Sequence, residues 1–147
     1  MTASDDRISD YLTRYADSLT AFDAETAAGL WSAPGMIVND RTSGVLDSRD
    51  AMVDGLRQSY PIYQRLGLAS VGFELLERRD LSDRLALVRV RWLFFDAGGA
   101  QLTDTDSYYL LRDEAEGLQA CVCVETDAAQ KLQALAAERG VDLTSLS

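Results

Sequence analysis

The chain has 147 residues, 47% apolar and 26% charged, which suits a single globular domain over residues 1–147 that needs no metal or disulfide to fold. Its formal net charge of −10 disfavours nucleic acids and anionic membranes as partners, because both bind basic patches. The absence of histidine excludes Ser–His and Cys–His catalysis, histidine-ligated zinc and a histidine general base.

The N-terminal part of the chain is predicted to be helical. Apolar side chains recur there at helical spacing and form one stripe: Ile8, Tyr11, Leu12, Tyr15 and Leu19. Ser4 is a suitable N-cap for this helix. Phe22-Asp23 predicts a break and a new cap, and the short second helix is expected to end at Pro34-Gly35.

A strand, a turn and a third helix are expected next. Met36-Ile37-Val38 is a short apolar strand, and residues 42–47 have the composition of a turn. Asp47 or Ser48 can cap the third helix, which Pro61 is expected to kink or end.

From residue 69 onward the apolar period changes from about 3.6 to 2, which predicts strands. The four runs are 69–79, 84–95, 101–112 and 117–126, and their short links predict an antiparallel meander of hairpins. The residues expected on its buried face are Val88, Val90, Trp92, Phe94, Tyr108 and Leu110. Asp127 and Gly140 fit the start and the end of a last helix.

Cysteines and targeting signals favour a cytoplasmic protein. Cys121 and Cys123 stand two residues apart on a predicted strand, too close for ordinary disulfide geometry, so two reduced, buried thiols are expected and a redox pair is the alternative. The acidic N-terminus does not resemble a secretory signal, and no apolar run approaches the roughly 18 residues of a transmembrane helix.

Helices followed by a meander predict an α+β fold, with N-terminal helices packed on a curved antiparallel sheet. Helices that cover only part of a twisted sheet leave a cone-shaped hollow, which is the usual place for a small-molecule site. The other face of the sheet is expected to be covered by a second copy of the chain, which gives a homodimer.

The order of these elements resembles the nuclear transport factor 2-like superfamily, which includes ketosteroid isomerases and SnoaL-type polyketide cyclases. The similarity covers nearly the whole chain and is carried by Arg14-Tyr15, Phe22-Asp23, Leu30-Trp31, and residues 36–40, 48–51 and 108–112. The resemblance implies a cone-shaped α+β barrel that binds a small apolar ligand. Neither a cofactor nor a metal is expected.

The resemblance also implies catalytic residues. Tyr15 is similar to the helix-one tyrosine that donates a hydrogen bond in ketosteroid isomerases, and Asp40 is similar to their general base. Asp106 matches their third member, a protonated aspartate, by residue type, and Ser107 matches it by spacing; the two lie on opposite faces of a strand, so at most one can enter the hollow. The expected ligand-binding residues are Tyr11, Trp31, Trp92, Phe94 and Tyr108.

Two of these features have other interpretations. Asn39-Asp40-Arg41 also fits a plain turn in which Asp40 caps backbone amides. Arg89 and Arg91 share one strand face, where they can pair with neighbouring acids or bind a substrate carboxylate. They also resemble the arginine strand of limonene-epoxide-hydrolase-like relatives.

The sequence therefore predicts a small-molecule-binding protein, with three versions of its function. The first is a proton-transfer isomerase or cyclase that acts on an apolar carbonyl compound. The alternatives are a non-catalytic ligand-binding or dimerisation module of the same fold, and an epoxide-hydrolase-like enzyme.

Overall fold

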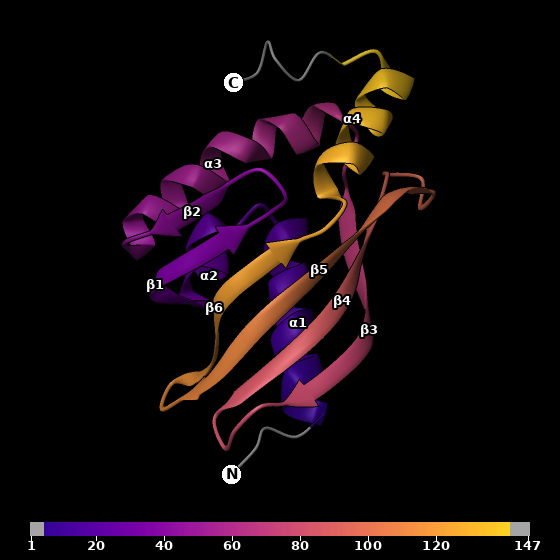
Figure 1. The fold of residues 1–147 in the computed structure, drawn as a ribbon. Coiled ribbons are helices and arrows are strands. Elements are labelled where there is room, and N and C mark those ends of the chain that lie inside the picture. The colour runs from indigo at the N-terminus through magenta and orange to yellow at the C-terminus, as the bar shows by residue number, and fades with distance from the viewer. Residues whose placement is uncertain (1–4, 142–147) are drawn as a thin grey trace.

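The computed structural model describes residues 5–141, in which the first three helices lie on one side of a curved, six-stranded sheet and the last helix lies at one end of it (Figure 1). The helices are α1 (Asp5–Thr20), α2 (Ala24–Gly29), α3 (Arg49–Arg65) and α4 (Ala128–Arg139). The strands are β1 (Trp31–Val38), β2 (Ser43–Leu46), β3 (Ser70–Asp80), β4 (Leu85–Phe95), β5 (Gln101–Glu114) and β6 (Gly117–Glu125). The predicted α+β fold is confirmed.

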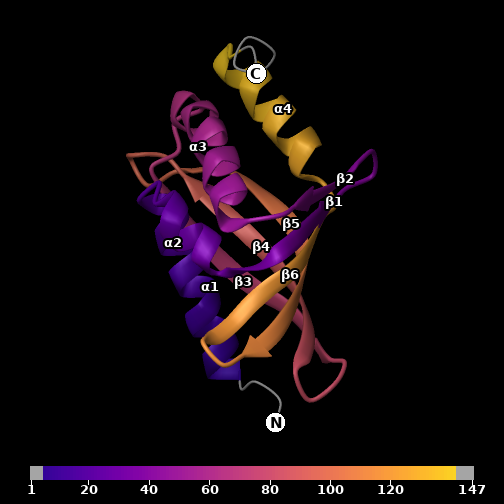
Figure 2. The same ribbon diagram turned by 90° about the vertical axis from the view of Figure 1, so that its left-hand side faces the viewer.

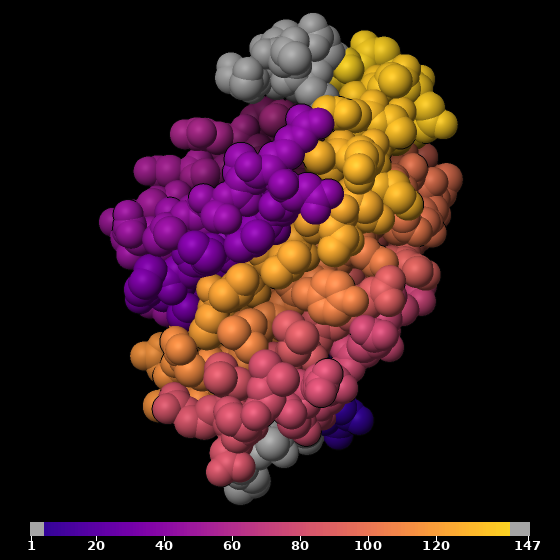
Figure 3. All heavy atoms as spheres, viewed as in Figure 1, coloured from indigo at the N-terminus to yellow at the C-terminus, as the bar shows by residue number. Residues whose placement is uncertain are grey.

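The sheet has the strand order β2-β1-β6-β5-β4-β3, and all neighbours are antiparallel except β1 and β6. The predicted meander of four strands is present as β3 to β6. Helices α1, α2 and α3 pack on one face, which we call the inner face (Figure 2). The space-filling view shows the opposite, outer face, where atoms of β4, β5 and β6 lie at the surface (Figure 3).

Side-chain caps fix the starts of two helices. Asp23 accepts a hydrogen bond from the Thr26 amide at the start of α2, and Ser48 accepts one from the Ala51 amide at the start of α3. Gly140 ends α4 in the left-handed conformation, as predicted. The predicted cap Ser4 lies outside the described residues. Asp127 precedes α4, but its carboxylate accepts a hydrogen bond from the Asp106 amide instead of capping the helix.

The segment between α2 and α3 differs from the prediction. The second helix ends at Gly29, and Pro34-Gly35 lies inside β1 instead of ending a helix. The stretch expected as a turn contains strand β2, paired with β1. The physical reason is long-range pairing: β1 finds its second partner in β6, more than 80 residues further along the chain, which a local pattern does not reveal.

Pro61 does not end or break α3, and the helix continues to Arg65 with the proline inside it. The last turn therefore remains helical and carries Tyr63 on the same face as Ser59 and Tyr60. This extension decides which hydroxyl groups reach the interior.

On β5, the buried residues are the ones next in sequence to those predicted. Tyr109 and Leu111 are buried, whereas Tyr108 and Leu110 lie half-buried on the outer face. The four consecutive large residues at 108–111 carry no alternation, so the pattern does not define which parity faces inward. On β4 the predicted face is correct, because Val88, Val90 and Trp92 are buried.

Within residues 5–141, no helix is long and apolar enough to cross a membrane. The main core joins the buried stripe of α1 to the inner face of β4, β5 and β6. A smaller cluster of Leu66, Leu135 and Ala136 fixes α4 against the end of α3. The core does not fill the space between α1, α3 and the inner face of the sheet.

Candidate functional site

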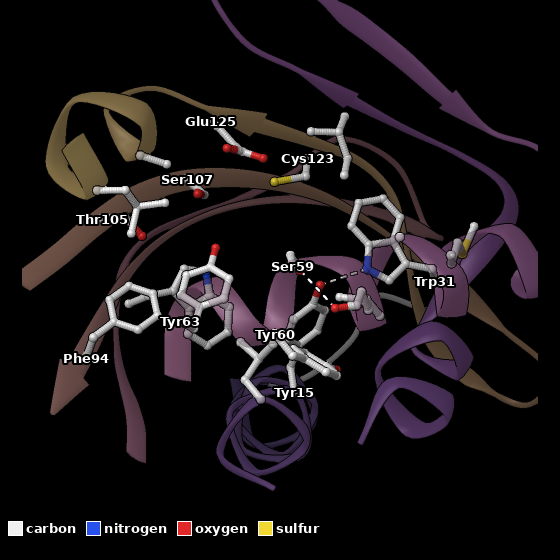
Figure 4. A pocket seen from close by; sticks show the side chains of 18 of the residues that line it. Tyr15, Trp31, Ser59, Tyr60, Tyr63, Phe94, Thr105, Ser107, Cys123 and Glu125 are labelled. Carbon is white, nitrogen blue, oxygen red and sulfur yellow. Dashed lines mark hydrogen bonds between the residues drawn. The ribbon is translucent and has the colours of Figure 1, made fainter. Parts of the chain in front are cut away.

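A cavity of about 400 Å³ lies between α1, α3 and the inner face of the sheet. Figure 4 shows side chains from the helices and from the sheet facing each other across it. Its volume is in the range of small-molecule sites. The lining residues that the argument uses are Tyr15, Trp31, Ser59, Tyr60, Tyr63, Trp92, Phe94, Thr105, Ser107, Tyr109, Cys123 and Glu125.

Aromatic side chains form one end of the cavity. Trp31 Nε1 donates a hydrogen bond to the Tyr15 hydroxyl at 2.9 Å, and Trp92 Nε1 donates one to the Tyr109 hydroxyl at 3.0 Å. The rings of Tyr15 and Trp92 are 5.4 Å apart. Both indole N–H groups are thus satisfied within a rigid, buried cluster, which presents ring faces and edges to the cavity.

The side chains with which β5 and β6 line the cavity belong to alternate residues of these strands. Thr105, Ser107 and Tyr109 are every second residue of β5, and Tyr109 is directly opposite Cys123 of β6. Glu125 follows Cys123 by two residues and is paired with Ser107. Because side chains alternate between faces, this register aims all of them at the inner side of the sheet.

Helix α3 supplies hydroxyl groups from the other side. The Tyr63 ring stacks on the Phe94 ring at 6.3 Å with an interplanar angle of 15°. Tyr60 is 7% exposed, and its hydroxyl is buried without a hydrogen-bond partner among residues 5–141. A buried hydroxyl without a partner carries a free-energy penalty, which a bound molecule with a polar group would relieve.

Among residues 5–141, Glu125 is the one carboxylate that lines the cavity, and no lysine or arginine of this part of the chain lines it. Within residues 5–141, the Glu125 side chain forms neither a hydrogen bond nor an ion pair. Burial raises the pKa of its carboxyl group above the ordinary value. Burial, together with the nearby Glu125 charge, also raises the pKa of Tyr63 to about 12. The cavity therefore holds an acidic group that is poorly solvated and has no positive neighbour.

Cys123 is not an activated thiol. Burial raises the pKa of its thiol to about 12, with Glu125 adding to the shift, and hydrogen bonds with Tyr109 and Ser107 only partly offset it. At neutral pH the group is a neutral SH, so the inner face offers no cysteine nucleophile. Both cysteines are free.

Four of the residues predicted for the site line the cavity: Tyr15, Trp31, Trp92 and Phe94. Tyr11 does not. Its ring is buried beneath the cavity and its hydroxyl donates a 2.6 Å hydrogen bond to the Leu30 carbonyl. It therefore has a structural position, with its donor already used.

The structure does not bring Asp40 and Tyr15 together, because Tyr15 lines the cavity and Asp40 does not. Asp40 is exposed in the turn between β1 and β2. The Asn39 side chain builds this turn by accepting hydrogen bonds from the amides of Arg41 and Thr42, at 2.9 and 3.0 Å. The turn interpretation of this segment therefore fits, with Asn39 and not Asp40 as the capping side chain.

Asp106 and Tyr108 lie on the outer face, and Ser107 is the member of the Asp106–Ser107 pair that enters the cavity. Asp106 Oδ2 accepts a 2.7 Å hydrogen bond from Arg89, and the Arg89 guanidinium lies 5.9 Å from the centre of the Tyr108 ring. Arg91 lies 3.8 Å from Asp106. Both arginines therefore point away from the cavity, which offers no epoxide-hydrolase-like set of groups.

Sequence reasoning did not identify Glu125 or the α3 hydroxyl groups. Glu125 stands at the end of a strand after Val-Cys-Val, and its spacing of two from Cys123 was a usable sign that it faces inward with the thiol. Tyr63 was hidden by Pro61, which led us to expect an early end or a kink of the helix.

Comparisons with known proteins agree with this architecture. A family model described as NTF2-like protein (DUF6841) matches residues 4–128. No curated protein matches the sequence.

Crystal structures of several proteins share the fold. An NTF-2 like protein of unknown function from Shewanella oneidensis is 16% identical with a TM-score of 0.67, over 83% of this chain and 98% of that one. A ketosteroid isomerase-like protein from Erwinia carotovora atroseptica is 16% identical with a TM-score of 0.61, over 82% and 93%. An NTF2-like protein with a cystatin-like fold from Novosphingobium aromaticivorans is 18% identical with a TM-score of 0.63, over 88% and 86%.

At these identities the solved structures establish the fold and nothing about activity. The family model, in contrast, matches well over half of the sequence. Together with the curved sheet, this shows that the chain belongs to the family of NTF2-like proteins (DUF6841).

Proposed function

We propose that this protein binds a small, largely apolar molecule in the cavity between α1, α3 and the sheet. The observation that carries the proposal is the 400 Å³ cavity itself, walled by aromatic and aliphatic side chains with a few hydroxyl groups and one carboxylate. Burial of apolar ligand surface against these walls contributes roughly 25 cal/mol per Å². The polar groups of Tyr60, Ser107 and Glu125 would fix the orientation of the ligand.

The test uses the neutral fluorescent probe N-phenyl-1-naphthylamine, whose emission rises in an apolar environment. We expect saturable binding to the wild-type protein. The substitution Ser59→Phe places a ring in the cavity and should weaken binding at least tenfold. The matched control Gln58→Phe adds the same ring on the exposed side of α3 and should change affinity less than twofold.

Two results would contradict the proposal. One is a wild-type protein that does not bind the probe at micromolar concentration. The other is equal affinity of Ser59→Phe and wild type, which would locate the probe elsewhere. Circular dichroism of each variant separates a blocked cavity from an unfolded chain.

A second candidate function is proton transfer next to the carbonyl group of a bound apolar ketone, with Glu125 as the general base. It is supported by the raised pKa of Glu125, since a base works best when its pKa is near the working pH. The carboxylate would take the proton from the carbon, and the electron pair would move to the carbonyl oxygen. The Tyr63 hydroxyl, which lines the same cavity, would donate a hydrogen bond to that oxygen.

This candidate is tested by the exchange of α-protons of 2-decalone in deuterated buffer, followed by NMR. We expect catalysed exchange that falls at least a hundredfold in Glu125→Gln and about tenfold in Tyr63→Phe. Exchange at the buffer rate with wild-type protein that binds the ketone would leave a binding protein without this activity.

We propose the cytoplasm as the compartment, supported by the two free thiols Cys121 and Cys123. Labelling of both thiols in the protein denatured directly from intact cells checks this. A disulfide-linked population there would oppose it.

A further inference from the structure

The cavity contains a carboxyl group, that of Glu125, with no positively charged partner among residues 5–141. Elsewhere in residues 5–141, several partly buried carboxylates form ion pairs, among them Asp106 with Arg89, Asp104 with Lys131, and Glu114 with Arg84, and the partly buried Asp127 accepts a hydrogen bond from the Asp106 amide. Glu125 is also partly buried but has no ion pair, and the only cause of its shifted pKa is burial. An ionised group held in this way is unfavourable unless something else supplies the countercharge.

The walls around Glu125 have the properties of a site for a cation with an apolar body. The stacked rings of Tyr63 and Phe94 come from opposite sides of the cavity, and Trp92 and Tyr15 extend the aromatic surface. Aromatic faces carry partial negative charge and attract ammonium groups within about 6 Å of the ring centre. The Glu125 carboxylate and the aromatic rings therefore both favour a positively charged ligand.

The same walls disfavour anions. In the part of the chain that the structure describes, no lysine or arginine lines the cavity, so a ligand carboxylate or phosphate would meet Glu125 without a compensating charge from these residues. The net charge of −10 adds a long-range preference for cations. A neutral ligand would fit sterically but would leave the carboxylate unpaired.

We infer that the cavity takes a compact apolar amine, with its ammonium group on Glu125 and its hydrocarbon body against the aromatic walls. This inference rests on the proposed binding function and adds the charge class of the ligand. The hydroxyl of Tyr63, whose pKa the Glu125 charge helps to raise, lines the same cavity and can accept a further ammonium hydrogen bond.

The experiment compares three probes of nearly equal shape: adamantan-1-amine, adamantan-1-ol and adamantane-1-carboxylate. Trp31 and Trp92 are the only tryptophans of the chain and both line the cavity, so quenching of intrinsic fluorescence reports binding, with calorimetry as an independent check. At neutral pH we expect the amine to bind at least tenfold more tightly than the alcohol. The carboxylate should bind at least tenfold more weakly than the alcohol.

The variant Glu125→Gln should lose at least tenfold in affinity for the amine and less than threefold for the alcohol. The control Glu116→Gln removes the same charge at an exposed turn and should leave all three affinities within twofold of wild type. Loss of amine preference only in Glu125→Gln assigns the preference to this side chain rather than to net charge.

Equal affinity for amine and alcohol, or tighter binding of the carboxylate, would overturn the inference and leave the proposed apolar binding intact. Failure of all three probes in a protein that binds N-phenyl-1-naphthylamine would overturn it as well. Failure of that neutral probe too would overturn the proposed function itself.

Discussion

Neighbouring residues of β5 lie on opposite faces of the sheet. Acidic side chains on the outer face form ion pairs, whereas Glu125 on the inner face forms none within residues 5–141. On the outer face, Asp106 accepts a 2.7 Å hydrogen bond from Arg89, and Asp104 forms an ion pair with Lys131. On the inner face, Glu125 is paired with Ser107 in the ladder and has no cation beside it. Charges that the protein neutralises itself belong to its fold, whereas an unneutralised charge in a cavity is available to a ligand.

The contrast extends to aromatic residues. Tyr109 is 5% exposed, and its hydroxyl accepts the hydrogen bond of Trp92. Tyr108, its neighbour in sequence, lies half-buried on the outer face beside Arg89. Two consecutive tyrosines therefore have different surroundings: Tyr109 packs in the core, and Tyr108 lies beside an ion pair on the outer face.

The largest effect is expected from truncating these two tyrosines. Tyr109→Ala should lower the free energy of unfolding by about 3–4 kcal/mol, because it leaves a cavity and an unpaired indole N–H. Tyr108→Ala should cost only about 1 kcal/mol, because its ring is partly solvated. Urea unfolding measures both, and equal losses would contradict the assignment of faces.

The outer face is where we predict the contact of a homodimer. Register places an outer apolar row across the strands, formed by Val45, Met36, Val122, Leu110 and Leu87. If a second copy covers this row, sedimentation should give twice the 16.1 kDa of one chain. Leu110→Asp should then weaken association at least a hundredfold, about 2.7 kcal/mol.

The control for the dimer is Leu81→Asp, which adds the same charge at a side chain that is 51% exposed in the β3–β4 turn. It should leave the mass unchanged. A wild-type protein that sediments as one chain at tens of micromolar would show that the outer row needs no second copy.

A smaller effect distinguishes the two kinds of carboxylate by stability. Asp106→Asn removes the charge that Arg89 holds and should lower the free energy of unfolding by about 1–2 kcal/mol. Glu125→Gln removes an unpaired charge and should raise Tm at neutral pH, by roughly 3 °C for each kcal/mol gained. Thermal unfolding of both variants tests the comparison, and a lower Tm for Glu125→Gln would contradict it.

The sign of the pH dependence follows from the raised pKa of Glu125. Below the unfolded-state pKa, both states are protonated and Glu125 has no effect on stability. As pH rises further, the unfolded chain releases its proton first, so stability falls until the folded-state pKa is passed. Tyr63 and Cys123, which face this group, stay protonated throughout because both have pKa values of about 12. The advantage of Glu125→Gln should therefore be absent below the unfolded-state pKa and should grow as the pH rises above it, until the raised folded-state pKa is passed.

The meander was predictable because its information is local. Alternating apolar residues and short turns locate four strands to within about two residues, and the observed bounds agree with them. Pairing of β1 with β6 was not predictable, since it joins segments from opposite ends of the chain. Without that pairing, neither the strand at residues 43–46 nor the early end of α2 follows from the pattern.

The candidate site was predictable only in its aromatic part. Trp31, Trp92 and Phe94 are large apolar residues on predicted elements, and burial alone brings them to the cavity. The family resemblance implies Asp40 as the general base. Asp40, however, lies in a turn whose geometry depends on the Asn39 side chain. The position of a carboxylate relative to a cavity depends on such local turns and on strand parity.

The smallest effect is expected from Asp40→Asn, which tests the catalytic role that the resemblance implies for Asp40. Asp40 is exposed and lies outside the cavity, so the free energy of unfolding should change by less than about 0.5 kcal/mol. Affinity for N-phenyl-1-naphthylamine and the rate of α-proton exchange should stay within twofold of wild type. A hundredfold loss of exchange in Asp40→Asn, with Glu125→Gln unaffected, would mean that the β1–β2 turn folds over the bound ketone. The general base would then be Asp40, and Glu125 would be left as a charge that only orients the ligand.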